Sequence, residues 1–391
     1  MPEAIAMTRR LRVGVVYGGR SGEHEVSLRS AATVIGALDP ERFEVIPIAI
    51  TKDGRWLTGR DSLRLLDEAQ RVLAPVVEHG DEVMLPPVPS RGTLVPVGGG
   101  AGTSTLDVVF PVLHGTFGED GTIQGLLDMA GIPYVGAGVL ASSAGMDKAI
   151  MKAVFRDAGL PGCRWIVSRP ALESVNAVRA RVESELGFPC FVKPCNLGSS
   201  VGVAKVKTAG ELAAALADAS AYDPRVIIEE AIDARELECG VLGNEQAEAS
   251  VVGELMPSHE FYDYADKYIE DKVRWVIPAE LPADVSETVR ALAVRAFHAI
   301  DGSGLARVDF FLERGTGRLL LNEINTMPGF TAASMYPLMW QASGVPLPAL
   351  VEKLVTLAFE RHAARAKRRL SFSPPEALSA PAPQRSSRGG R

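Results

Sequence analysis

The chain has 391 residues, which is long enough for two or three domains of ordinary size. Lys and Arg total 41 and Asp and Glu total 48, so the net charge is −7, while 47% of the residues are hydrophobic. The acidic balance argues against nucleic acid as a partner, and the apolar content suits a chain with a sizeable core. Since no run of 18 or more apolar residues occurs, we expect no membrane span.

Cysteine usage and the first apolar stretch bear on the compartment. No C-x-x-C pair occurs and the six histidines are scattered, so we expect reduced thiols rather than a zinc site. The stretch Val13–Tyr17 is too short for the core of a signal peptide and is followed by glycines. Both features favour the cytoplasm. The cysteines are Cys163, Cys190, Cys195 and Cys239.

The first part of the chain alternates predicted strands and helices. Leu11–Tyr17 is an apolar strand, a glycine turn follows it, and Ser27 is placed to cap a helix that runs to about Leu38. This alternation predicts an α/β domain with a parallel sheet and with ligands at the C-terminal ends of its strands. Residues 86–106 are rich in Pro, Gly, Ser and Thr, and we expect an irregular surface excursion there. Further strands are predicted at Phe43–Ile50 and Asp107–Leu113.

The middle of the chain has several short strands and few long helices, which predicts a mixed or antiparallel α+β module. Beyond it, a helix at Asp284–Ile300, a strand pair and a last helix at about Pro348–Ala363 are expected. We predict an N-terminal α/β domain (1–138), a central domain (139–230), a C-terminal domain (231–370) and a disordered tail (371–391). The predicted strands are Pro189–Pro194, Val201–Val206, Val226–Glu230, Arg307–Glu313 and Arg318–Asn325, and a short helix is predicted at Glu211–Ala219.

Three oxygen-bearing side chains on the last strand pair predict a metal site. With an odd-length connection, Asp309 and Glu323 lie directly opposite each other, and Asn325 shares their face. Facing carboxylates repel unless a cation lies between them, and hard oxygen ligands suit Mg²⁺ that also binds phosphates. The alternative is a solvated strand face with acids there by chance. It is disfavoured because both strands are otherwise apolar.

A second candidate site is the loop Lys193–Gly202, where a lysine at a strand end meets Gly and Ser residues. Small residues let backbone N–H groups approach phosphate oxygens, and the lysine adds a positive charge. No Walker A pattern occurs, so this is not a P-loop. The alternative is an ordinary turn with an exposed lysine.

Three further polar stretches are ambiguous from the local sequence alone. Glu23 is well placed to hold an ammonium group, but Glu23 and Glu25 equally suit the positive end of a helix dipole. His114, in a glycine-rich loop after a strand, is either a structural hydrogen-bonding residue or a catalyst. Three acids lie near the domain junction: Glu229, Glu230 and Glu236. Adjacent glutamates are usually surface residues, and the alternative for Glu236 is a contact with ribose hydroxyls.

Taken together, these stretches resemble the signatures of the D-alanine–D-alanine ligases, members of the ATP-grasp superfamily. The matching segments occur in the family's order and span about residues 11–360. The resemblance implies an ATP-grasp fold of α/β and α+β parts, preceded by an N-terminal parallel-sheet domain, with ATP between the central and C-terminal domains. The segments are Gly18–Ser27, His114–Gly121, Lys193–Gly202, Arg307–Asp309 and Asn322–Ser334.

The resemblance also implies a nucleotide site that holds ATP and two Mg²⁺ (or Mn²⁺) ions. Lysines contact the phosphates, acids and an isoleucine line the adenine pocket, and a further acid binds ribose. By motif position these are Lys148, Lys193 and Lys267 for phosphate, Glu229, Glu230 and Ile232 for adenine, Glu236 for ribose, and Asp309, Glu323 and Asn325 for the metal ions.

For the substrates, the resemblance implies that Glu23 holds the ammonium of the first D-alanine and Ser334 the carboxylate of the second. Arg307 and the Gly329 N–H stabilise developing negative charge. A mobile loop at 261–268 brings Tyr268 to Ser199 and Glu23 on closure, which keeps water from the intermediate. A tyrosine at this position favours D-alanine over D-lactate as the second substrate.

The implied reaction is ATP-dependent ligation of two D-alanines through an acylphosphate, for peptidoglycan synthesis, by a homodimer in the cytoplasm. Positioning and charge neutralisation dominate such phosphoryl transfer, which fits a sequence with metal ligands, lysines and glycines. One alternative is an ATP-grasp ligase for another carboxylate–amine pair. The other is a nucleotide-binding regulator without turnover, which the presence of both Asp309 and Glu323 disfavours.

Overall fold

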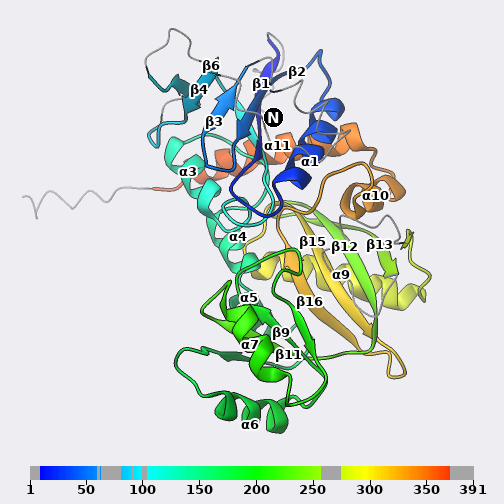
Figure 1. Ribbon diagram of the computed structural model, residues 1–391. Coiled ribbons are helices and arrows are strands. Elements are labelled where there is room, and N and C mark those ends of the chain that lie inside the picture. The colour runs from blue at the N-terminus through cyan, green and yellow to red at the C-terminus, as the bar shows by residue number, and fades with distance from the viewer. Residues whose placement is uncertain are drawn as a thin grey trace, which may run out of the picture.

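The computed structural model describes residues 9–59, 62, 81–89, 92–98, 104–256 and 274–369. Within those ranges the chain forms sheets of seven, four and five strands. Figure 1 shows the seven-stranded sheet at one end of the molecule, the five-stranded sheet in the middle and the four-stranded sheet at the other end. The predicted tail (371–391) and the predicted mobile loop (261–268) lie outside the described residues.

The N-terminal sheet is mixed rather than purely parallel. β1 (Leu11–Gly18) runs parallel to β2 (Phe43–Ile50) and to β7 (Val108–Val112), as the strand–helix alternation predicts. Beyond β2 the sheet continues in antiparallel pairs, and two of its strands form within 86–106, where the expectation of irregular structure is wrong. The parallel part is the part that carries the site loops. The antiparallel strands are β3 (Trp56–Thr58), β4 (Asp81–Met84), β5 (Thr93–Pro96) and β6 (Ser104–Thr105).

Helix α1 (His24–Ala37) begins earlier than predicted, and the prediction of Ser27 as its N-cap is wrong. Glu23 holds the cap position. The Ser27 hydroxyl donates to the Val112 carbonyl and accepts from the Gly18 N–H at 2.8 Å. These bonds tie α1 to the C-terminal ends of two parallel strands and so fix Glu23 at the edge of the sheet where ligands bind in such folds. Helix α3 (Thr122–Ala130) packs on the same domain.

The central sheet is antiparallel throughout, within the range of the sequence-based prediction. β9 (Cys190–Pro194) lies between β10 (Ala204–Val206) and β11 (Val226–Glu230), and β8 (Trp165–Ser168) forms an edge. Lys193 therefore stands at the end of an interior strand, directly before the candidate phosphate loop. Two helices share a hydrophobic core with this sheet: α6 (Val175–Glu185) and α7 (Leu212–Ser220).

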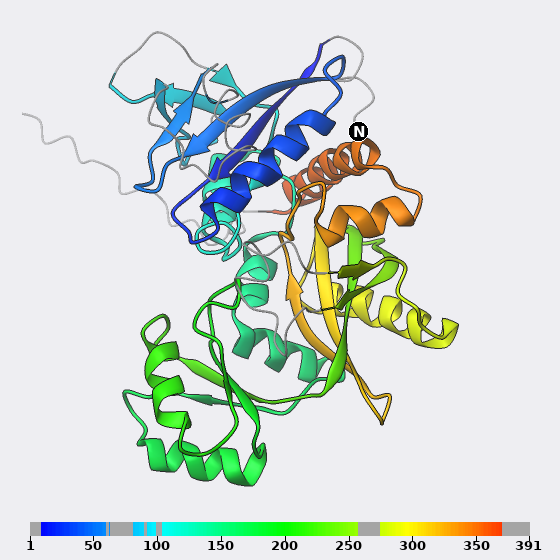
Figure 2. The ribbon, with the colours of Figure 1, turned by 45° about the vertical axis from the view of Figure 1, so that its right-hand side comes forward.

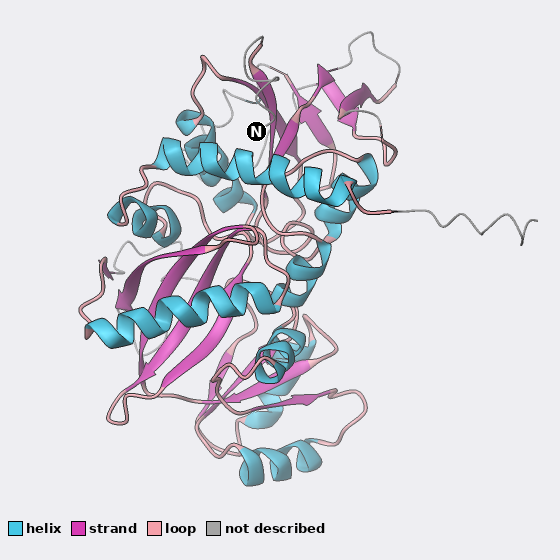
Figure 3. Ribbon diagram, turned by 180° about the vertical axis from the view of Figure 1, so that it is seen from behind, coloured by secondary structure: helices cyan, strands magenta, loops and turns pink. Residues whose placement is uncertain are grey.

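The C-terminal sheet is polar on one face and apolar on the other. Its strand order is β14-β13-β12-β15-β16, and all the pairs are antiparallel. Helix α9 (Ala283–Ala299) crosses the apolar face, as Figure 3 shows, and buries Val289, Ala293 and Phe297 there. The other face carries the site residues and packs in part against the helix Met335–Ala342. The strands are β12 (Ala234–Gly243), β13 (Glu248–Met256), β14 (Arg274–Val276), β15 (Gly304–Glu313) and β16 (Leu319–Asn325).

Three helices pack against a sheet outside their predicted domain. α4 (Val139–Met146) and α5 (Lys148–Asp157) precede the central sheet, yet their apolar residues join the core of the five-stranded sheet. α11 (Leu347–Ala366) follows the five-stranded sheet but packs with α1 beside the N-terminal sheet (Figure 2). Helices α4 and α5 thus belong to the core of the five-stranded sheet, and α11 belongs to the core of the N-terminal sheet. The predicted boundaries at 138, 230 and 370 remain a prediction.

The last two helices connect the sheet to the N-terminal domain. α10 (Met335–Ala342) follows the loop after β16 and buries Tyr336 and Trp340 beside the start of α11. Among the described residues, no single helix is long and apolar enough to cross a membrane. By length and composition only, α10 and α11 meet that criterion as a pair, which is bent by 105°.

Candidate active site

Three carboxylates from adjacent strands form a row across the polar face of the five-stranded sheet. Asp309 on β15 lies opposite Glu238 on β12 and opposite Glu323 on β16. The predicted pairing of Asp309 with Glu323 is confirmed. Sequence reasoning missed Glu238, although the alternation of Glu236 and Glu238 along a strand is a signal that could have found it.

The cause of this pairing is a β-bulge rather than the length of the connection. The register at the hairpin end pairs Leu312 with Leu319, and continued regularly it would set Asn322 opposite Asp309. The register shifts between Asp309 and the next residue, so Asn322 is the extra residue of a bulge. Without that shift Glu323 would oppose Val308, on the face that packs against α9. The bulge therefore keeps Glu323 on the polar face.

Arg307 lies between two of these acids. It donates from Nε and Nη2 to Asp309 at 2.7 Å each, and its Nε lies 3.1 Å from Glu238. Burial lowers its pKa, but the attraction of Asp309 and Glu238 raises that pKa well above its ordinary value. Arg307 also lies opposite Asn325, so the arginine and the three predicted metal ligands share one face. A fixed cation there suits developing negative charge.

The donor set fits a hard divalent cation. Asp309 and Glu323 supply carboxylates and Asn325 an amide oxygen, which in this structure accepts from the Met327 N–H at 3.1 Å. Over the described ranges, no three His, Cys, Asp or Glu residues meet the geometry of a metal site by themselves. The predicted set has only two acids and one amide, and Asp309 accepts hydrogen bonds from Arg307 in this structure. Such a sparse set matches Mg²⁺ with waters and phosphate oxygens as further ligands.

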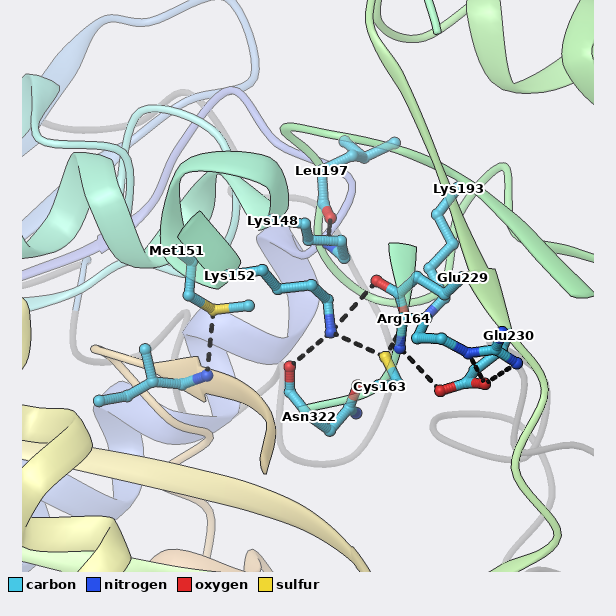
Figure 4. Close-up of polar contacts among 11 residues, drawn as sticks. Lys148, Met151, Lys152, Cys163, Arg164, Lys193, Leu197, Glu229, Glu230 and Asn322 are labelled. Carbon is cyan, nitrogen blue, oxygen red and sulfur yellow. Dashed lines mark hydrogen bonds and ion pairs between the residues drawn. The ribbon is translucent and has the colours of Figure 1, made fainter. Parts of the chain in front are cut away.

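A second polar cluster surrounds Glu229 where the central sheet meets the C-terminal sheet (Figure 4). Glu229 is 2% exposed, and it accepts from Lys193 at 2.8 Å and pairs with Lys152 at 3.3 Å. Burial raises its pKa, but the two lysines lower it to about 2. The Cys163 thiol completes the cluster, 3.8 Å from Glu229, and burial raises its pKa. Glu229 is thus a buried, ionised group rather than a surface acid.

The other predicted nucleotide residues come from α5, β11, β12 and the connection between these two strands. Lys148, at the start of α5, donates to the Leu197 carbonyl at 2.6 Å, within the candidate phosphate loop. Glu230 accepts from the backbone and side chain of Arg164 at 2.7 Å. Ile232 lies between β11 and β12, and Glu236 is on β12 opposite Phe311. Lys148, Lys193 and Glu229 are brought together, whereas Lys267 lies outside the described residues.

The candidate phosphate loop reaches the N-terminal domain. Ser199 donates from its hydroxyl to the carboxylate of Glu23, 176 positions away in the chain. Ser199 and Ser200 both have positive φ, 53° and 56°, a conformation that L-residues adopt at a cost and that often marks a functional loop. A Cβ on Gly115 would lie 2.6 Å from the Glu23 carboxylate, so a larger residue there would displace it. Glu23 and Ser199 are thus in direct contact, whereas their predicted bridge through Tyr268 stays a prediction.

Two buried side chains, His114 and Glu119, form hydrogen bonds close to the Glu23 loop. His114 contacts the Met327 carbonyl through Nδ1 at 3.1 Å and Ser30 through Nε2 at 3.0 Å, and burial lowers its pKa. These contacts fit the structural alternative for His114, and a role in catalysis stays a prediction. Glu119, which sequence reasoning passed over, accepts from the Gly115 N–H at 2.6 Å. Burial and the nearby Glu23 raise the pKa of Glu119 well above its ordinary value.

The loop after β16 completes the site. Ser334 stands at the N-cap of α10, and its hydroxyl accepts from the Thr331 N–H at 3.0 Å. Gly329 lies against it, since a Cβ there would be 3.1 Å from the Ser334 hydroxyl. The backbone N–H groups of this loop and a helix N-terminus are suited to anionic groups. Tyr268 lies outside the described residues.

Two antiparallel sheets that carry lysines and a row of carboxylates, beside a domain with a mixed sheet whose central strands are parallel, define an ATP-grasp enzyme. Family models agree: the N-terminus of the D-ala D-ala ligases matches residues 12–137, and their C-terminus matches residues 154–356. The chain therefore belongs to the D-alanine–D-alanine ligase family, and it is an ATP-dependent ligase.

Similar proteins cover nearly the whole chain. The chain is 48% identical to the D-alanine–D-alanine ligase of Geobacillus kaustophilus over 356 residues, 90% of this chain and 96% of the relative. It is 51% identical to D-alanine–D-alanine ligase A of Bradyrhizobium diazoefficiens over 367 residues, 92% and 98% of the two chains. The solved D-alanine–D-alanine ligase of Coxiella burnetii has a TM-score of 0.80 and 34% identity, covering 92% of this chain and 96% of its own. The VanG D-Ala:D-Ser ligase of Enterococcus faecalis has the same TM-score and identity, covering 90% and 100%.

Proposed function

We propose that this chain joins two molecules of D-alanine into D-alanyl-D-alanine for peptidoglycan synthesis. ATP phosphorylates the carboxylate of the first D-alanine, the amine of the second attacks the resulting acylphosphate, and phosphate leaves. Family membership and the high identity to named D-alanine–D-alanine ligases support this reaction over the regulator without turnover. We further propose that the enzyme acts as a homodimer in the cytoplasm.

The observation that carries the proposal is the contact between Ser199 and Glu23. It joins the loop that follows Lys193, where phosphate would lie, to an acid that would hold an ammonium group. An amino acid bound by Glu23 would therefore have its carboxylate directed toward the nucleotide. Effective positioning of two reactants in this way supplies much of the rate in phosphoryl transfer.

The chain's own residues then have separate tasks. Lys148 and Lys193 bind phosphate oxygens, Glu229, Glu230 and Ile232 line the adenine pocket, and Glu236 binds ribose. Asp309, Glu323 and Asn325 would hold two Mg²⁺ ions, which supply charge neutralisation at the transferred phosphoryl group. Arg307 and the Gly329 N–H stabilise the developing oxyanion, Ser334 orients the second D-alanine through its carboxylate, and Lys267 and Tyr268 close the site against water.

The identity of the second substrate, the acceptor, distinguishes a D-alanine–D-alanine ligase from a ligase for another carboxylate–amine pair. A similar solved structure is named a D-Ala:D-Ser ligase, so the fold alone does not choose the acceptor. Tyr268 supports D-alanine by resemblance to the family, in which a tyrosine at this position favours D-alanine over D-lactate. We propose that Tyr268→His admits D-lactate at neutral pH. Absence of any depsipeptide product from that variant would count against Tyr268 as the selector.

The test is product analysis by mass spectrometry after incubation with ATP, Mg²⁺ and D-alanine, alone and with equal D-serine or D-lactate. We expect D-alanyl-D-alanine as the main product in all three mixtures. A main product of D-alanyl-D-serine would overturn the assignment of the acceptor. No dipeptide in any mixture, despite ATP consumption, would favour another carboxylate–amine pair.

A further inference from the structure

Lys152 has no place in the mechanism above, yet it is the most buried lysine near the site. Its side chain is 6% exposed, and it extends from α5 toward the junction of the central and C-terminal sheets (Figure 4). Its ammonium pairs with Glu229 at 3.3 Å and donates to the Asn322 carbonyl at 3.0 Å. Burial of an ammonium without such partners is strongly unfavourable, so these contacts hold it in one place.

The Asn322 carbonyl belongs to the bulge residue of β16. β16 is an edge strand, so its outer backbone groups have no neighbouring strand to pair with. The segment around α5 covers this edge instead. Besides the contact from Lys152, the Ile324 N–H donates to Met151 Sδ at 3.4 Å and the Leu321 N–H donates to the Pro161 carbonyl at 2.7 Å.

The bulge is the local feature on which the metal face depends. It turns Glu323 onto the polar face opposite Asp309, and Asn325 follows on the same face. A bulge leaves one residue outside the regular ladder, so its backbone needs a partner from elsewhere. Lys152 supplies a charge-assisted hydrogen bond to that residue, which is stronger than a neutral one.

Glu229 is what keeps the ammonium of Lys152 at this position. Glu229 binds two lysines, and only one of them, Lys193, stands at the start of the candidate phosphate loop. With Lys193 assigned to phosphate, Lys152 is the second cation that neutralises the buried Glu229 carboxylate. Lys152 therefore connects the nucleotide pocket to the strand that carries Glu323.

We propose that Lys152 is a positioning residue for the metal site: it fixes the bulge at Asn322 so that Glu323 and Asn325 face Asp309. The proposal rests on the proposed function, which assigns the metal to these side chains. Residues that orient metal ligands without touching the metal commonly change metal affinity about 10–100-fold when replaced. Lys152 thus belongs to the metal site although it touches neither metal nor substrate.

The test is Mn²⁺ binding in the presence of ADP, followed by electron paramagnetic resonance and without turnover. Lys152→Met keeps the apolar stem and removes the donor, and we expect Mn²⁺ affinity to fall about tenfold or more. Lys152→Arg keeps a cation and donors, and we expect it to recover part of that loss. Arg290→Met is the matched control. It removes another helix cation that donates to strand carbonyls, those of Ala249 and Ser250 on β13, and it should leave Mn²⁺ affinity unchanged.

The outcomes separate the two proposals. If the unsubstituted protein binds no Mn²⁺ with ADP, the proposed function fails. If it binds Mn²⁺ and Lys152→Met binds it equally well, only the role of Lys152 fails, and any change in thermal stability is then purely structural. Should Lys152→Met not fold, Lys152→Gln replaces the charge-assisted bond on which the proposal rests with at most a neutral one. Unchanged Mn²⁺ affinity in Lys152→Gln overturns the proposal, and weakened affinity supports it.

Discussion

The site has a half built on strands and a half built on loops. The strand half holds Glu238, Asp309 and Glu323 in one row, fixed by backbone pairing across three strands. The loop half holds Glu23 against Ser199, with positive φ at Ser199 and Ser200 and glycines packed around the carboxylate. Backbone pairing with one bulge at Asn322 holds the first, whereas the second depends on costly backbone conformations that the surrounding fold must maintain.

This difference follows the chemistry assigned to each half. Charge neutralisation at a phosphoryl group needs ligands at fixed mutual spacing, and a sheet provides that directly. Recognition of a small amino acid needs groups from separate domains to meet around it and to part again. We therefore expect substitutions in the strand half to affect turnover most, and substitutions in the loop half to affect amino-acid affinity most.

The largest expected effect is that of Arg307→Ala in the strand half. It removes the cation beside Asp309 and Glu238, and loss of one such donor costs about 10²–10³-fold in kcat. Steady-state kinetics should show that loss with a much smaller change in KM for ATP. Arg314→Ala, an exposed arginine on the same hairpin, serves as control and should have normal kinetics. Near-normal turnover in Arg307→Ala would contradict the assigned role.

Next in size is Glu23→Gln in the loop half. Loss of a charge-assisted bond of about 1.5–3 kcal/mol should raise KM for the first D-alanine about 10–100-fold and leave ATP binding nearly unchanged. Glu25→Gln tests the alternative of a helix-dipole role, because Glu25 is also in the first turn of α1 and pairs with Lys52. If both variants raise KM equally, the ammonium role of Glu23 is wrong.

A third prediction concerns pH and the buried Glu229. Because its pKa is about 2 in the folded protein, well below the ordinary value near 4.5, its contribution to stability is present above pH 4.5 and is lost as the pH falls toward 2. The full contribution is about 3 kcal/mol or less. Urea unfolding should show the gap between the unsubstituted protein and Glu229→Gln narrowing from pH 5 to pH 3.

Glu313 provides the comparison for that experiment. The hydrogen bond from Arg318 lowers the pKa of Glu313 to about 2 as well, but Glu313 is only partly buried at the end of β15 and its partner Arg318 is exposed. Solvent screens such pairs, so Glu313→Gln should change the acid sensitivity far less than Glu229→Gln does. An equal effect at both positions would mean that burial does not increase the contribution of Glu229 and its two lysines to stability.

The smallest effects concern backbone strain. Asp301, outside the site at the end of α9, has φ of 62°, close to the 53° of Ser199. Asp301→Gly should raise the free energy of unfolding by up to about 1 kcal/mol with no kinetic change, since glycine adopts this conformation freely. Ser199→Gly should raise the free energy of unfolding by a similar amount through relief of backbone strain. Because it removes the hydroxyl that contacts Glu23, it should also raise KM for D-alanine. Unchanged KM would show that the contact has no functional role.

The two halves also differ in how far the sequence predicts them. Spacing two apart is enough to place Glu323 and Asn325 on one face. That this face is also the face of Asp309 depends on the bulge at Asn322, which is not visible in the residue pattern. Lys152, four residues after Lys148, reads as an ordinary helix position. Its role depends on contacts with residues 77 and 170 positions away, and no local pattern encodes such distances.

For the loop half, local sequence leaves Glu23 undecided between an ammonium site and a helix dipole. Its meeting with Ser199 is a product of domain arrangement, so only the resemblance to a family predicts it. The fold shows the same division. The parallel strands β1, β2 and β7 follow from alternation, whereas the antiparallel strands within 86–106 form in a stretch whose composition resembles a loop.

The most direct test of the whole account is phosphate release with ATP and Mg²⁺, measured with D-alanine, with L-alanine and with neither. The account predicts steady release with D-alanine, almost none with L-alanine, and loss of release when Mg²⁺ is chelated. Release with L-alanine only, or release that does not depend on an amino acid, would contradict it.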